Sequence, residues 1–267
     1  MKNIGIVGLG VVGSGILNYY ETINKYVIYK YDKYKKNGNI EDILKCDLLF
    51  LCLPTPFEEG LKTYNIKEIQ NICNYLKEHN YNGIILLKST VIPGTTKQLI
   101  SHYKLRIIHN PEFLSQKTAN EDFKNQIQIV LGGNIEHTNV VKSFYENDFP
   151  NVKISEMLSD ESEIVKLSLN NFYSVKIQFF TELYLLCQNL NNGDCNIDFN
   201  KIKDSMLLNK WIHPNHTQIP GHDGQVSYGG MCFPKDTNAL LNFMKDHTDY
   251  YSILEATVNE RNKLRTD

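Results

Sequence analysis

IGIVGLGVVG, residues 4–13, joins a short apolar run to three spaced glycines. Residues 4–7 are typical of a buried strand, and residues 14–21 beyond the glycines have the pattern of a helix. Glycines at such a junction permit a tight turn and a close approach of the backbone, so a pyrophosphate can lie at the helix N-terminus. We therefore predict a dinucleotide-binding site at Gly8, Gly10, Val11, Val12 and Gly13.

An acidic residue stands where such a site needs one. Residues 26–31 form a second apolar strand, and Asp32 follows it, about twenty residues beyond the glycines. A carboxylate at this position binds the ribose hydroxyls of NAD and repels the 2′-phosphate of NADP. Strand, helix and acid together predict NAD as the cofactor; the alternative is a glycine turn that binds nothing.

Strands and helices continue to alternate through the first half of the chain. Four further apolar runs predict strands, at residues 46–53, 84–87, 105–108 and 128–131. Residues 66–79 and 96–103 between them have helical spacing. This rhythm predicts an α/β domain over residues 1–155, a Rossmann-type, doubly wound and mostly parallel sheet.

The character of the sequence changes after about residue 155. Residues 161–190 carry apolar side chains at helical spacing without a proline or glycine, and shorter helical patterns follow. This predicts an all-helical domain over residues 156–267 with one long central helix. Because such a helix offers a long packing surface, we expect a homodimer.

Composition excludes several classes of function. A net charge of −2 and a hydrophobic content of 42% argue against nucleic-acid and membrane partners. The polar start runs directly into a strand, so we expect no signal peptide. Six cysteines without CxxC spacing favour a reduced, cytoplasmic protein. His213, His216 and His222 lie in a polar loop without regular spacing, so we expect no metal site.

One cysteine near the C-terminal end stands in a chemically suggestive setting. Residues 229–236 read GGMCFPKD. Cys232 follows a flexible glycine pair, while Lys235 and Asp236 supply a cation and a carboxylate, as a thiol nucleophile requires. The alternative is a buried cysteine in a turn that enters a helix at Pro234, with Asp236 as a cap.

Other polar residues have the spacing of a site. Glu163, Lys166 and Asn170 share one face of the long helix, where a lysine and an amide can polarise a substrate oxygen. A solvated helix face is the alternative. Thr90 and residues 109–114 follow two predicted strands, at the sheet edge where α/β proteins bind ligands, although ordinary turns are also possible there.

Five separated segments read GLGVVG (8–13), STVIPGT (89–95), NPEFL (110–114), KLSLN (166–170) and GGMCFPKD (229–236). In this order they resemble the UDP-glucose/GDP-mannose dehydrogenase family over nearly the whole chain. The last segment is very specific, whereas the first is shared by many enzymes. The resemblance implies that a nucleotide sugar is oxidised at its C6 alcohol to a carboxylate, in a four-electron reaction with two NAD⁺.

The resemblance also implies individual roles. Cys232 would trap the aldehyde as a thiohemiacetal and then carry a thioester. Lys166 would stabilise an oxyanion at C6 beside Asn170, and Asp236 and Thr90 would orient or activate water. The implied substrate-binding residues are Glu112, Phe113, Leu114, Lys166, Asn170, Tyr228 and Gly229. Thr55, Thr90 and Lys235 are the implied additions to the cofactor site.

The sequence also departs from the family pattern. A glutamate that assists thioester hydrolysis usually follows the NPEFL segment, and Gln116 stands there, so hydrolysis would rely on Glu112 or Asp236. Trp211 occupies the place of a substrate-contacting arginine. Family members normally continue into a second Rossmann-like domain, and we expect this domain to be absent or supplied by a separate chain.

Two other functions remain open. A β-hydroxyacid dehydrogenase has the same pair of domains and a Lys-x-x-x-Asn helix motif, but it leaves the cysteine unused. A non-catalytic protein that binds NAD or a nucleotide sugar is the third hypothesis, and Gln116 favours it.

Overall fold

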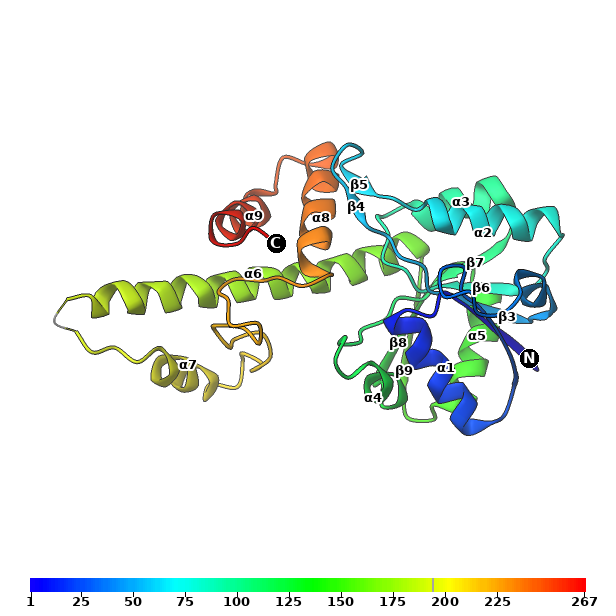
Figure 1. Ribbon diagram of the computed structural model, residues 1–267, viewed down its shortest axis with the longest axis horizontal. Helices are drawn as coiled ribbons and strands as arrows, with labels where there is room; N and C mark the ends of the chain where they lie inside the picture. The colour runs from blue at the N-terminus through cyan, green and yellow to red at the C-terminus, as the bar shows by residue number, and fades with distance from the viewer. Residues whose placement is uncertain (194) are drawn as a thin grey trace. The chain divides into compact units, whose positions relative to one another are not determined.

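A computed structural model describes residues 1–193 and 195–267 (Figure 1). The chain divides into two compact units, Met1–Pro56 with Tyr64–Leu167 and Phe57–Thr63 with Ser168–Asp267. This division lies beyond the predicted boundary at residues 155/156, because the first turns of helix α6 (Ser159–Asn191) belong to the first unit.

The first unit is built on a seven-stranded sheet in the order β2-β1-β3-β6-β7-β8-β9. Neighbouring strands are parallel except β7 and β8, which are antiparallel. The strands are β1 (Asn3–Val7), β2 (Val27–Tyr31), β3 (Leu48–Leu51), β6 (Ile84–Leu87), β7 (Arg106–His109), β8 (Gln128–Gly132) and β9 (Lys153–Met157). Because β2 and β3 flank β1, the strand order reverses there, and this is where doubly wound sheets bind their ligands.

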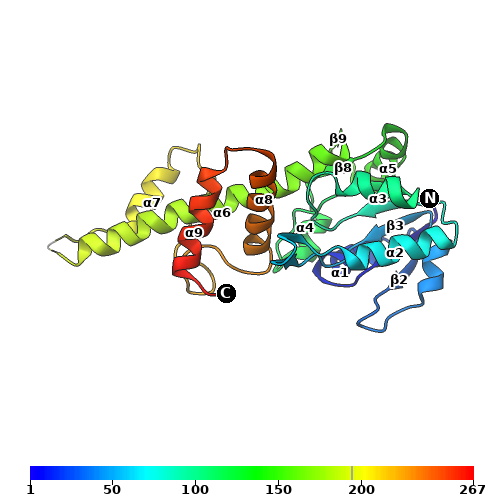
Figure 2. The same cartoon turned by 90° about the horizontal axis from the view of Figure 1, so that it is seen from above.

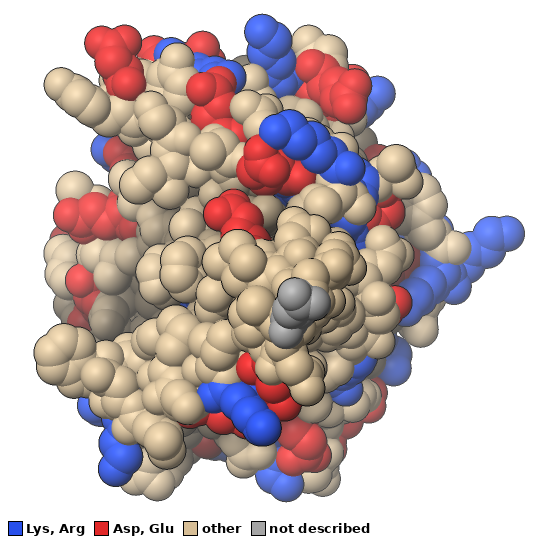
Figure 3. Space-filling view, turned by 90° about the vertical axis from the view of Figure 1, so that its left-hand side faces the viewer, with Lys and Arg blue, Asp and Glu red and all other residues tan. Residues whose placement is uncertain are grey.

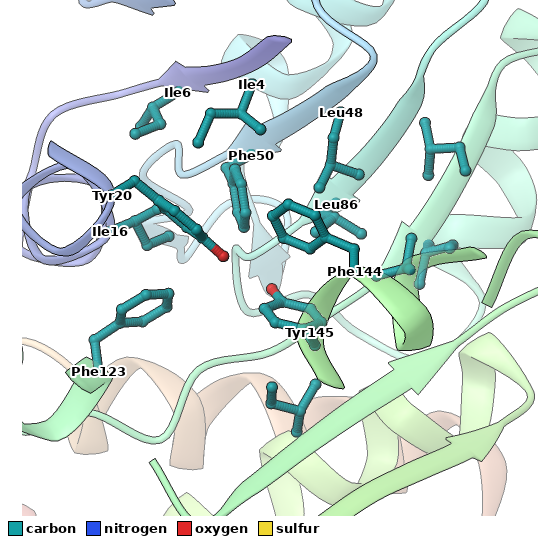
Figure 4. Close-up of a cluster of buried hydrophobic side chains, with 14 of the residues drawn as sticks. Ile4, Ile6, Ile16, Tyr20, Leu48, Phe50, Leu86, Phe123, Phe144 and Tyr145 are labelled. Carbon is teal, nitrogen blue, oxygen red and sulfur yellow. The ribbon is translucent and has the colours of Figure 1, made fainter. Parts of the chain in front are cut away.

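Helices cover both faces of the sheet (Figures 1 and 2). They are α1 (Val11–Ile23), the 3₁₀ helix η1 (Ile40–Lys45), α2 (Lys67–Glu78), α3 (Thr95–Tyr103), α4 (Ala119–Lys124) and α5 (Ile135–Asp148). Strand residues alternate between two cores. Leu48 and Phe50 pack with α1, α4 and α5 (Figure 4), and Leu49 and Leu51 pack with α2 and α3. Burial on both faces explains why these strands are continuous apolar runs.

The second unit consists mainly of helices. The rest of α6 packs with α7 (Phe199–Leu207), α8 (Phe233–His247) and α9 (Ser252–Leu264). A short pair of strands, β4 (Phe57–Glu58) and β5 (Thr63–Tyr64), stands between β3 and α2 in the chain. Uncharged side chains dominate the centre of the face in Figure 3. Among the described residues, no helix is long and apolar enough to span a membrane.

The predicted fold class is confirmed: a Rossmann-type, mostly parallel sheet precedes a helical region with one long helix. Four elements of the first unit, η1, α4, α5 and β9, and the β4–β5 pair were not predicted from the sequence. The second unit is therefore not all helical, unlike the prediction, because residues 57–63 with the β4 strand belong to it.

Candidate active site

The glycine turn after β1 admits no side chain at two of its three positions. Gly8 has a φ of +86°, and a Cβ atom there would lie 2.3 Å from the carbonyl oxygen of Cys52. A Cβ atom on Gly13 would lie 1.9 Å from the carbonyl oxygen of Gly8. These two glycines therefore let α1 start close against β1 and β3.

Gly10, in contrast, faces open space. A Cβ atom there would have nothing within 4 Å. Gly10 also caps α1 without a side-chain hydrogen bond, and the first turn of α1 holds no acidic residue. Val11 and Val12 are the first two residues of that turn. Open space in front of a helix N-terminus suits the pyrophosphate of a dinucleotide, so the turn fits the predicted cofactor.

Asp32 lies beside the glycine turn, as predicted. Its carboxylate accepts hydrogen bonds from the backbone N–H groups of Leu9 (2.7 Å), Tyr34 (3.0 Å) and Lys35 (2.8 Å). Burial raises the pKa of Asp32, but the three hydrogen bonds outweigh it and hold the pKa below its ordinary value. The residue is thus an oriented carboxylate, the form that binds ribose hydroxyls.

Thr55 and Thr90 meet beyond the ends of β3 and β6. The Thr55 hydroxyl donates to the carbonyl oxygen of Thr90 at 2.8 Å. Next to this contact, the Ser89 hydroxyl donates to the carbonyl oxygen of Leu53 at 2.6 Å. The two loops are thereby joined at the edge of the sheet where the glycine turn also lies.

Glu112 and Lys166 form an ion pair within the first unit. The Lys166 ammonium donates to Glu112 Oε1 at 3.0 Å and to the Glu112 carbonyl oxygen at 2.6 Å, and it lies over the Phe113 ring. The other carboxylate oxygen, Glu112 Oε2, accepts from the Leu114 N–H at 2.6 Å. The structure therefore brings together four residues that the sequence assigned to one site, and it fixes the lysine by two bonds.

Glu163 does not belong to the polar cluster that was predicted for its face of helix α6. Its buried carboxylate accepts from the N–H groups of Gly94 (2.7 Å) and Thr96 (2.8 Å) and so caps α3. Burial raises the pKa of Glu163 even though these hydrogen bonds lower it. Glu163 is thus neither part of a polar cluster with Lys166 nor solvated; it ties α6 to α3.

Lys88 is a buried polar residue that the sequence analysis missed. It follows β6, and its ammonium donates to Asn110 Oδ1 at 3.0 Å and to the Pro111 carbonyl oxygen at 3.4 Å. The Tyr145 hydroxyl donates to the same Asn110 oxygen at 2.6 Å. The sequence signal that could have revealed this residue is a lysine placed directly after a buried strand. The network fixes the backbone immediately before Glu112.

The burial of Lys88 predicts a pH-dependent stability. Burial lowers its pKa from 10.5 to about 8, against the opposing effects of Cys52 and Glu112. Between these values the unfolded chain binds more protons than the native one, so this group's contribution to stability rises with pH. The measured quantity is the unfolding free energy of the wild type minus that of Lys88→Met. We expect this difference to increase by about 3 kcal/mol between pH 8 and pH 10.5. Urea denaturation of both proteins measures this, and parallel pH curves would refute it.

In the second unit, Cys232 is exposed and directly precedes the first residue of α8. The Asp236 N–H donates to the Cys232 carbonyl oxygen at 3.0 Å, as in a first helical turn. The predicted helix entry near Pro234 is therefore present, but the buried cysteine of that alternative is wrong. A helix N-terminus stabilises negative charge, and a thiolate is the nucleophilic form of cysteine.

Asp236 is fully buried and held from two sides. Asn170 Nδ2 donates to Asp236 Oδ2 at 2.6 Å, and the Lys235 ammonium lies 2.5 Å from Asp236 Oδ1. Asn171 Nδ2 donates to the Asp236 carbonyl oxygen at 3.2 Å. Two residues predicted for catalysis, Asn170 and Asp236, are thus in contact, and Lys235 pairs with one of them.

Tyr228 and Gly229 lie in the loop before the cysteine. Tyr228 is buried and its hydroxyl donates to the Thr237 hydroxyl at 3.3 Å. A Cβ atom on Gly229 would lie 2.2 Å from Nη2 of Arg265, which the sequence analysis did not consider. Arg265 directly follows α9, 36 residues beyond Gly229 in the chain, so no local pattern pointed to it.

The two residues that depart from the family pattern and the three histidines lie mostly at the surface. Gln116 and Trp211 are exposed, Trp211 by 93%. His213 and His222 are exposed, and His216 stacks on Tyr173 with ring centroids 4.3 Å apart. Within residues 1–193 and 195–267, no group of three potential metal ligands occurs.

A Rossmann unit with an oriented acid, followed by a helical unit with an exposed cysteine, defines a dehydrogenase of the two-domain, nicotinamide-dependent class. The sequence profile of the UDP-glucose/GDP-mannose dehydrogenase family, NAD binding domain, matches residues 14–149, and the profile of its central domain matches residues 160–263. The chain belongs to the UDP-glucose/GDP-mannose dehydrogenase family, and NAD is its cofactor.

Individual relatives agree with this assignment. A UDP-glucose 6-dehydrogenase of Rickettsia conorii is 30% identical over 98% of this chain and 67% of its own length. A UDP-glucose dehydrogenase structure from Pyrobaculum islandicum has a TM-score of 0.82 at 23% identity, covering 98% of this chain and 68% of that one. A 3-hydroxyisobutyrate dehydrogenase structure from Mycobacterium tuberculosis has a TM-score of 0.73 at 12% identity, with 98% and 93% coverage. The chain thus spans about two thirds of the length of the UDP-glucose dehydrogenases.

Proposed function

We propose that this protein oxidises the C6 alcohol of a nucleotide sugar to the uronic acid, UDP-glucose to UDP-glucuronate, through Cys232. One observation carries the proposal: the exposed Cys232 precedes α8 by one residue, one turn before a buried Asp236 that Asn170 and Lys235 hold. The name of the Rickettsia conorii relative supports UDP-glucose as the sugar nucleotide.

The first unit would hold the cofactor. The N–H groups at the start of α1 would bind the pyrophosphate in front of Gly10, and Asp32 would bind the adenosine ribose. Thr55, Thr90 and Lys235 are the further proposed contacts. When bound, NAD⁺ accepts one hydride in each of the two oxidations.

Lys166 would act on the oxygen at C6. An ammonium next to this oxygen stabilises negative charge that develops when the alcohol loses its proton and when a nucleophile adds to the aldehyde. Its two bonds to Glu112 hold the charge in place before substrate binds. Phe113 and Leu114 would supply backbone contacts to the sugar nucleotide, with Tyr228 and Gly229 on the loop before the cysteine.

Cys232 would hold the aldehyde between the two oxidations. The thiolate adds to the aldehyde carbon, forming a C–S bond, and the oxygen takes up a proton to give the thiohemiacetal. Loss of that proton and of a hydride leaves a thioester. Water then adds to the thioester carbon and the C–S bond breaks, which releases the carboxylate and returns the thiolate.

Hydrolysis requires a group that orients or deprotonates water, and Gln116 cannot serve as a base. Asp236 is one candidate, because its carboxylate lies one turn after Cys232 in α8. Glu112 is the other candidate, and Thr90 would help to place the water. The Glu112 carboxylate lies 3.0 Å from the Lys166 ammonium, which is the group proposed to act on the C6 oxygen.

Counting NADH tests the proposal directly. We expect two NADH for each UDP-glucose consumed, because the aldehyde stays on the enzyme until the second oxidation. One NADH, produced from a hydroxyacid, would instead identify a β-hydroxyacid dehydrogenase. Bound NAD without turnover of UDP-glucose would identify the non-catalytic protein.

The β-hydroxyacid alternative is not favoured. Its likeness to this chain is one of fold, at 12% identity, whereas both family profiles match the chain in order. The β-hydroxyacid dehydrogenase reaction also does not use Cys232. The boundary of the two domains near residue 155 remains a proposal beside the structural division after Leu167.

We also propose that the protein is a cytoplasmic homodimer that pairs along α6. The part of α6 in the second unit exposes four large apolar side chains at spacings of seven, seven and four residues, which places them on one face: Phe172, Phe179, Leu186 and Leu190. A second copy of the same helix would cover this stripe symmetrically. Sedimentation equilibrium tests the dimer, and a monomer at all concentrations would refute it.

A further inference from the structure

The loop that leads into Cys232 has an unfavourable backbone conformation. Ser227 has a φ of 64° and Gly230 a φ of 78°. Glycine adopts positive φ freely, but a serine does so only when its surroundings hold it there. Ser227 is buried, so contacts with the protein rather than with solvent must hold it.

Helix α6 holds this loop from one side. The Ser227 N–H donates to the Thr181 hydroxyl at 2.9 Å, and the Ser227 hydroxyl donates to Gln178 Oε1 at 2.6 Å. Both partners are buried in the second unit. These two bonds fix the serine but do not reach the residues that follow it.

The C-terminal end of helix α9 holds the loop through two buried arginines, Arg261 in its last turn and Arg265 directly after it, 6% and 5% exposed. Arg261 Nε donates to the Tyr228 carbonyl oxygen at 3.3 Å, and Arg265 Nη1 donates to the Ser227 carbonyl oxygen at 3.4 Å. Arg265 Nη2 pairs with Asp223 at 2.7 Å and lies where a side chain on residue 229 would be. A guanidinium with its fixed fork of donors can hold several such groups together.

We propose that Arg261 and Arg265 are positioning residues that hold residues 227–229 and thereby set the position of the Cys232 thiol. The inference rests on the proposed function, in which Cys232 is the nucleophile. The connection is short: Gly230 and Met231 alone separate the held segment from the cysteine. When the segment is released, Cys232 remains the residue before α8, but the direction of its thiol relative to the helix N-terminus, which stabilises negative charge, is no longer fixed.

The reactivity of Cys232 toward iodoacetamide tests this proposal without substrate. The alkylation rate is measured by mass spectrometry of the peptide that carries Cys232, in Arg261→Met, Arg265→Met and Arg106→Met. Arg106 is the matched control, since its guanidinium donates to the Asn82 carbonyl oxygen at 3.1 Å in the first unit. We expect alkylation about tenfold slower in the two α9 variants and unchanged in the control.

Arg265→Lys covers the case in which a methionine variant does not fold. A lysine keeps the charge beside Asp223 but lacks the fork that also reaches the loop, so its rate should fall as well. In turnover, kcat per folded molecule should fall while the KM for NAD⁺ stays unchanged. Because a smaller folded fraction also lowers the apparent kcat, urea denaturation of each variant measures the folded fraction by which kcat is divided.

Folded α9 variants that alkylate at the wild-type rate would overturn the proposal. If the wild type does not oxidise UDP-glucose, the proposed function fails, yet the alkylation rates still decide the role of the arginines.

Discussion

Cys232→Ser is expected to lower the rate of uronic acid formation by about 10⁴-fold, while NAD affinity stays within a factor of two or so. A serine hydroxyl is almost fully protonated at neutral pH, so it does not add to an aldehyde as a thiolate does. The cysteine also belongs to the second unit, whereas the glycine turn that would bind the cofactor belongs to the first. The measurement is NADH release with UDP-glucose, together with a titration of NAD⁺.

Cys195→Ser is the matched control for this change. Cys195 is the other exposed cysteine of the second unit in the part of the chain that the structure describes. We expect its substitution to leave turnover unchanged. A Cys232→Ser protein that keeps a tenth or more of the wild-type rate would exclude the covalent mechanism.

Gly13→Ala is expected to lower the free energy of unfolding by about 3 kcal/mol or more. The added methyl would lie 1.9 Å from the carbonyl oxygen of Gly8 and 3.0 Å from its carbonyl carbon. Both are backbone atoms of the turn after β1, so α1 or the turn must move. Urea denaturation measures the loss, and NAD binding should be lost with it.

Gly10→Ala separates folding from binding at the same turn. The added methyl meets no atom within 4 Å, so stability should change by about 0.5 kcal/mol at most. The methyl would, however, occupy the space through which a pyrophosphate approaches, and we expect the Kd for NAD⁺ to rise about 100-fold. If Gly10→Ala binds NAD⁺ as the wild type does, the pyrophosphate does not lie in front of Gly10.

Much of the first unit was predictable because local patterns determine it. The run at residues 84–87 coincides with β6, and the amphipathic pattern at residues 66–79 contains α2. Helix α5 and strand β9 were missed because their segment is rich in polar residues: α5 reads IEHTNVVKSFYEND, in which no regular apolar face stands out, and β9 lies at the sheet edge. Such elements form because the adjoining sheet accepts them, not because their own pattern is strong.

The candidate site was predictable in composition but not in pairing. Motif spacing identified Glu112, Lys166, Asn170 and Asp236, yet it did not indicate which side chains bond to which. Glu163 caps a helix 67 residues earlier in the chain, and Lys88 reaches Asn110 from a neighbouring strand end. No sequence pattern marks a partner at such distances.

The amino-acid sequence was sufficient for several features that depend on neighbouring residues: the glycine turn, the buried strands, the long helix and a helix that begins near Pro234. Backbone conformation and the periodicity of apolar side chains act over a few residues, so they can be read locally. The folded chain was needed to reveal the burial of Lys88, the partner of Glu112, and the contacts of Arg261 and Arg265 at the end of α9. Burial and the partners of charged groups depend on segments that meet only after folding, and these set the electrostatics of the site.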